Sequence, residues 1–130
     1  MGISIGGGIV FYQVPETGNT LTTTYAVPAN ISSSTLTIDM QNSWNYATVN
    51  TAISQIQFIN IPESGKVGST LLEIKQDSTG GRTISGTSYV TPGGTALDIS
   101  ALANSTSLIS FFTRDGGNTI YGINTGKNWS

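Results

Sequence analysis

Turn-forming residues recur along this chain and divide it into short extended segments. Asp115–Gly116, Pro92–Gly93 and a Gly80–Gly81 pair each stand between runs of β-branched and apolar residues. Such signals recur about every ten residues, a spacing typical of all-β sandwiches and barrels, and no segment has a convincing helical period. We therefore predict a single all-β domain, an antiparallel β-sandwich that resembles a jelly roll.

Alternation of apolar and polar side chains indicates strands with one face toward the core and the other toward solvent. In residues 35–40, Leu36, Ile38 and Met40 alternate with polar side chains, which predicts a strand with one face toward the core. In residues 53–61, Ile56 and Phe58 share a face in the same way. These segments supply the expected core.

Two hairpins are predicted from the turn chemistry. In LLEIKQDSTGGRTISG at 71–86, residues 71–76 alternate between faces, 77–81 supply turn residues and 82–84 resume an extended run. The second hairpin joins 108–113 to 119–123 through DGGN at 115–118. Residues 96–104 between them are expected to be irregular, with room for a single helical turn.

The order of these turn motifs resembles a known group of proteins. QDSTGGRTI at 76–84, PGGT at 92–95, DG at 115–116 and YG at 121–122 follow the motif order of small β-rich phage virion modules, found on tail fibres and capsid decorations. The resemblance covers residues 35–122 and rests on turn residues. It implies an all-β fold and a virion protein assembled in the host cytoplasm. It also implies a homotrimer whose partners are the major capsid protein or other virion subunits.

Composition narrows the function further. Charged residues make up 9% of the 130 residues, against about 25% in ordinary soluble domains. With a net charge of −2, colloidal repulsion is weak and self-association is expected. The five cations are dispersed, which argues against a nucleic-acid partner. The apolar start lacks a positive region and is too short to span a bilayer, so we expect no membrane partner.

Residues 1–15 are predicted to form an extended N-terminal arm, followed by the sandwich domain at 16–130. The segment IVFYQV at 9–14 is apolar on both faces, which indicates burial inside a sheet or against another subunit. The candidate assembly-interface residues are Ile3, Ile5, Ile9, Phe11 and Tyr12.

We expect this chain to have neither a catalytic site nor a metal site. Histidine and cysteine are absent, which removes the commonest general base and the thiolate metal ligands. A glycosidase needs two carboxylates facing across a cleft, whereas Glu63, Asp77 and Asp115 lie in turns. Asp77 is followed by too few oxygen ligands for calcium. We therefore expect a protein that is not an enzyme and has no cofactor.

Two functions follow as hypotheses. The first is a non-enzymatic capsid decoration (cement) protein that binds the shell through its N-terminal arm, by strand addition and apolar contacts. The alternative is a tail- or head-fibre receptor-binding module that contacts host surface glycans through loops at 42–45 and 92–95. Exposed aromatic side chains would then serve as stacking platforms, with the candidates Trp44, Tyr46, Tyr89 and Trp129.

Overall fold

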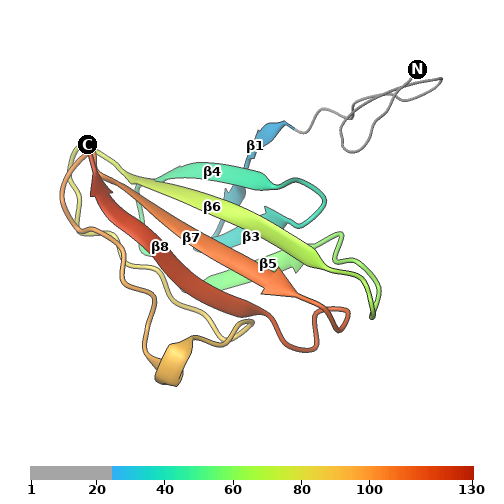
Figure 1. The fold of residues 1–130 in the computed structure, drawn as a ribbon. Helices are drawn as coiled ribbons and strands as arrows, with labels where there is room; N and C mark the ends of the chain where they lie inside the picture. Colours follow the sequence, from blue (N-terminus) through green and yellow to red (C-terminus); the bar gives the residue numbers. More distant parts are fainter. Residues whose placement is uncertain (1–24) are drawn as a thin grey trace, which may run out of the picture.

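The computed structural model describes residues 25–130, which form two β-sheets packed face to face (Figure 1). The five-stranded sheet has the order β1-β4-β6-β7-β8, and the three-stranded sheet has the order β2-β3-β5. The strands are β1 (Ala26–Pro28), β2 (Asn30–Ser32), β3 (Thr35–Asp39), β4 (Trp44–Val49), β5 (Gln55–Ile59), β6 (Gly68–Gln76), β7 (Thr106–Thr113) and β8 (Tyr121–Trp129). A single 3-10 turn, η1, spans Pro92–Gly94. The all-β sandwich expected from the sequence is confirmed.

Both sheets are mixed, so the expectation of antiparallel strands throughout is wrong. β7 is antiparallel to β6 and β8, but β4 is parallel to β1 and β6, and β3 is parallel to β5. The cause is the connectivity, because β3, β4, β5 and β6 alternate between the two sheets. β5 therefore returns beside β3 and β6 beside β4, and each runs in the same direction as its partner. The crossover through the opposite sheet is the long connection that parallel neighbours need.

The core lies between the two sheets. Alternation along each strand turns every second side chain inward, so both sheets contribute buried apolar residues. Those that are at most 1% exposed are Leu36, Ile38, Val49, Ile53, Ile56, Leu72, Ile74, Ile109 and Phe111. The ring of Phe111 also makes edge-on contacts with Phe58 and Tyr89, at centroid distances of 5.1 and 5.6 Å. The alternating segment at 35–40 is buried as the sequence predicted.

The hairpin predicted at 71–86 is not formed. β6 ends at Gln76, and its two neighbours are β4 and β7 rather than residues 82–84. Gly80 and Gly81 take φ values of +75° and +77°, and the chain crosses to the other sheet, where Ile84 pairs in parallel with Ile53. Gly80 and Gly81 were expected to form a hairpin turn within one sheet. Instead, the chain leaves the five-stranded sheet at these two residues.

The second predicted hairpin is confirmed. β7 and β8 are antiparallel neighbours, and the Asp115–Asn118 turn joins them. Gly116 and Gly117 take the positive φ values that this turn requires, +71° and +87°. β8 continues to Trp129, beyond the end at 123 that the sequence indicated. The irregular conformation predicted for 96–104 is also observed.

Candidate functional site

The predicted assembly residues Ile3, Ile5, Ile9, Phe11 and Tyr12 lie outside the described residues, as does the predicted boundary between 15 and 16. The described chain begins at Tyr25 and enters β1, which is an edge strand of the five-stranded sheet. The N-terminal residues are therefore joined to the domain at the β1 edge of this sheet.

The outer face of the five-stranded sheet carries more apolar side chains than charged ones. In β6, Leu72 and Ile74 point into the core, so Leu71, Glu73 and Lys75 point outward. The strand register places further apolar side chains beside them on this face. These are Trp44 and Tyr46 on β4, Leu108 and Phe112 on β7, and Tyr121 and Ile123 on β8.

Phe112, Tyr121 and Ile123 form a cluster of exposed apolar side chains on this face, which we call the aromatic ridge. Their exposed fractions are 42%, 48% and 44%. Phe112 and Tyr121 are cross-strand partners with ring centroids 5.7 Å apart and planes inclined by 23°, so the two rings stack. This ridge was not predicted from the sequence. Its signal was the Phe111–Phe112 pair, because two adjacent residues of a strand point to opposite faces.

A hollow of about 190 Å³ borders Ile123 and is lined in part by Asp98, and two further hollows contact Phe112. The larger has a volume of about 570 Å³ and lies over β6, β7 and β8, with Leu71, Phe112 and Ile123 as its apolar lining. The smaller has a volume of about 260 Å³ and lies between the ridge and the segment Val90–Pro92. Phe112 and Ile123 border both hollows. Their lining residues include hydroxyl and amide groups but no charged side chain.

The four aromatic residues proposed for sugar stacking have different environments. Tyr46 and Trp129 are 41% and 55% exposed. Trp44 is half-buried, and its indole Nε1 donates a hydrogen bond of 2.9 Å to Glu73 Oε1. Tyr89 packs on Phe111, and this burial raises the pKa of its phenol. Of the two predicted contact loops, 42–45 contributes Ser43 to the larger hollow and 92–95 contributes Pro92 to the smaller.

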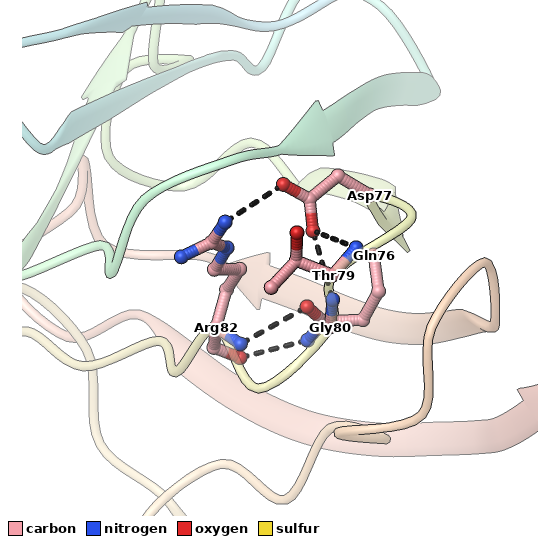
Figure 2. A network of polar contacts seen from close by, with 5 residues as sticks. All are labelled: Gln76, Asp77, Thr79, Gly80 and Arg82. Atoms are coloured by element: carbon pink, nitrogen blue, oxygen red, sulfur yellow. Dashed lines mark hydrogen bonds and ion pairs between the residues drawn. The ribbon is translucent and has the colours of Figure 1, made fainter.

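The loop after β6 is held by the side chain of Gln76, which is 1% exposed (Figure 2). Its Oε1 accepts a hydrogen bond from the Arg82 N–H at 3.0 Å. Its Nε2 donates to the carbonyl oxygens of Arg82 at 2.7 Å and Ser100 at 2.9 Å. A side-chain amide thus takes the place of a strand partner for the Arg82 backbone, which explains why 82–84 leaves the sheet.

The carboxylates with shifted pKa values serve the backbone of turns. Asp77 pairs with Arg82 at 2.9 Å and accepts hydrogen bonds from the N–H groups of Thr79 and Gly80. The Arg82 guanidinium and the Gly80 N–H hold the pKa of Asp77 below its ordinary value. At the β7–β8 turn, the N–H of Thr119 is the main cause of a lowered pKa for Asp115. Both groups stabilise turns as anions, a structural role.

Metal and membrane sites were also considered for residues 25–130. Within this range, no group of three or more Asp, Glu, His or Cys side chains is placed to hold a metal ion. Among the same residues, no helix has the length and apolar character needed to cross a membrane.

Comparisons of the chain with protein families, with curated proteins and with solved structures found no match. The likeness to phage virion modules therefore remains a prediction from the turn motifs. The class of protein that the structure itself defines is an all-β sandwich whose outer sheet face exposes several apolar side chains.

Proposed function

We propose that this chain is a non-enzymatic structural protein of a phage virion, a capsid decoration protein that is held on the shell by its N-terminal arm. The observation that carries the proposal is the low charge of the chain together with the apolar side chains that the described domain exposes, such as Tyr46 and Phe112. The two-sided apolar segment at 9–14 lies outside the described residues, and its sequence pattern suits burial against a partner.

The mechanism is adhesion by burial. Ile3, Ile5, Ile9, Phe11 and Tyr12 enter apolar pockets between shell subunits or trimer mates, while strand addition satisfies the backbone of the arm. Ordering the backbone costs about 1–2 kcal/mol for each residue, so the arm binds only where burial is extensive. Assembly into a shell of repeated subunits provides such a site many times over.

The surface of the domain supports the same role. Only 9% of the chain is charged, and apolar side chains such as Tyr46, Val67 and Phe112 are at least 41% exposed. Large exposed apolar surfaces mark interaction sites in soluble proteins. A subunit that stays in a particle tolerates such a surface better than a free monomer does.

Deletion of residues 1–12 tests the proposal. The shortened chain keeps all described strands, so we expect unchanged circular dichroism and thermal unfolding, together with loss of co-sedimentation with purified capsids. Val67→Ser is the matched control, because it removes an exposed apolar side chain outside the arm and should leave capsid binding intact. Equal capsid occupancy of the deletion variant and the full chain would refute the role of the arm.

The second candidate is a receptor-binding module on a tail or head fibre. The aromatic ridge favours it, because stacked and exposed rings beside hydroxyl groups suit a sugar ligand. Copy number separates the two functions. Quantitative gels of purified virions should give hundreds of copies for a decoration protein and only a handful for a fibre module.

A further inference from the structure

We propose that the aromatic ridge and the two hollows that contact Phe112 form a binding site for a neutral glycan. The inference concerns the domain alone and holds for a decoration protein as well as for a fibre module. Four observations carry it: the stacked rings, the uncharged polar lining, the contacts that cover part of the β8 edge and the distance of the site from β1.

The first observation is the geometry of the rings. Phe112 and Tyr121 stack across β7 and β8 with about half of each side chain exposed, and Ile123 extends the apolar surface along β8. Sugars carry apolar C–H faces that pack on aromatic rings, while their hydroxyl groups seek hydrogen-bond partners at the rim. Binding sites of this kind combine a mainly apolar lining with a few fixed polar groups.

The second observation is the chemistry of the lining. Ser69, Ser110, Asn124 and Thr125 place hydroxyl and amide groups around the larger hollow, and Ser110 and Thr125 are joined by a hydrogen bond of 2.8 Å. No charged side chain lines either of the two hollows. A nucleotide or an acidic glycan would need cations at its phosphate or carboxylate groups. A neutral oligosaccharide needs none, so the lining selects it.

The third observation concerns the edge of the sheet. β8 is an edge strand, and such strands commonly accept a peptide by strand addition. Here the Val90 N–H donates to Ile120 O, and the Gly122 N–H donates to Val90 O, each at 2.8 Å. Asn124 Nδ2 donates to the Asp98 carbonyl, and Lys127 pairs with the Asp98 carboxylate. Val90 thus pairs with the start of β8 beside Tyr121, and Asp98 contacts the side chains of Asn124 and Lys127 further along the strand. These contacts leave the side chains of the ridge as the binding surface.

The fourth observation is the placement of the site. The ridge lies on β7 and β8, whereas the N-terminal residues join the sheet at β1, its opposite edge. Three strands separate β1 from β8, a distance of roughly 19 Å at about 4.8 Å per strand. The ridge and β1 therefore lie at different edges of the sheet.

The full-length protein tests the inference on an array of neutral and acidic host-surface glycans, followed by titration of the hits, monitored by two-dimensional NMR. We expect neutral glycans to bind and the largest shift changes to occur at Phe112, Tyr121 and Ile123. Phe112→Ala and Tyr121→Ala should each weaken binding about tenfold or more. Tyr46→Ala is the matched control, because Tyr46 has a similar exposure on the same sheet and lines neither hollow.

Three results would overturn the inference. The first is an array without neutral hits. The second is equal weakening by Tyr46→Ala and Phe112→Ala. The third is an oligomer that dissociates in the variant Phe112→Ser during analytical ultracentrifugation, since the ridge would then be a subunit interface. Phe112→Tyr, which keeps the ring, must retain binding, and this variant separates a lost contact from a lost fold. Failure of capsid attachment alone bears on the proposed function and leaves the glycan site standing.

Discussion

Replacement of Gln76 by alanine should be among the most damaging single changes in this domain, although it alters no apolar side chain. Gln76 is buried at the end of β6, and its amide satisfies one N–H and one carbonyl of Arg82 and the carbonyl of Ser100. Alanine leaves three backbone groups without these partners. Because a buried unsatisfied group costs about 1–3 kcal/mol, we expect a loss of about 3–5 kcal/mol in the free energy of unfolding. At about 4 °C per kcal/mol for a domain of this size, the melting temperature falls by roughly 12–20 °C.

The nearly isosteric variant Gln76→Glu gives the reasoning a sharper test. Its carboxylate still accepts from the Arg82 N–H but faces the carbonyl oxygens of Arg82 and Ser100, so at pH 7 it should be at least as unstable as Gln76→Ala. Burial and the two carbonyls raise the pKa of the introduced carboxyl above its ordinary value of about 4.3. The folded state then binds the proton more tightly. The free energy of unfolding of Gln76→Glu therefore rises relative to that of Gln76→Ala as the pH falls through the raised pKa, since the protonated carboxyl can again donate a hydrogen bond.

Urea denaturation followed by tryptophan fluorescence, from pH 7 to pH 4, measures both variants against the wild type. The variant Gln57→Ala is the matched control, because Gln57 is exposed on β5 and should change stability by less than about 0.5 kcal/mol. If Gln76→Glu and Gln76→Ala differ by the same amount at every pH, the proposed hydrogen-bond donation to the two carbonyls is wrong.

Two further predictions concern the same loop. A Cβ on Gly80 would lie 2.6 Å from Ala101 O, whereas one on Gly81 would meet nothing within 4 Å, although the two φ values differ by only 2°. Gly80→Ala should therefore lower the urea midpoint clearly more than Gly81→Ala, and equal midpoints would contradict the close packing of this loop on 101–103. The lowered pKa of Asp77 gives stability that is present above its unfolded pKa and lost as the pH falls through the folded pKa. Asp77→Asn should flatten this acid limb, as followed by thermal unfolding between pH 6 and pH 2, and an unchanged limb would refute the role of the Asp77 pair with Arg82.

The alternation of apolar and polar residues along the sequence correctly predicted which side chains point into the core. Leu36, Ile38 and Ile56 are buried because a strand with one apolar face orients that face toward the core, whatever its neighbours are. The DGGN turn was also predicted, because its two glycines and Asp115 determine a tight reversal within a few residues. Both features depend on short-range chemistry that the sequence contains.

Strand partners could not be predicted in the same way. The run 82–84 has the β-branched character of a strand, but Gln76 binds the Arg82 backbone and the chain continues beside Ile53 of the other layer. This outcome depends on a contact with Ser100, far along the chain. The aromatic ridge likewise needs the β7–β8 register, which brings Phe112 opposite Tyr121. Pairings between distant residues leave no periodic signal in a single sequence.

The mixed topology also explains why β1 and β8 lie at opposite edges of the five-stranded sheet. β1 is recruited to the sheet as the parallel neighbour of β4, whereas β8 is added at the other end by the local β7–β8 hairpin. β1 and the aromatic ridge are therefore placed by independent pairings at opposite edges of one sheet (Figure 1). If the arm is held in a shell, the β8 edge can face outward, because the rigid sheet between them keeps the two edges apart. Attachment and ligand contact can then be lost separately, so a variant of the ridge should still occupy capsids while a chain without its arm should still bind glycan.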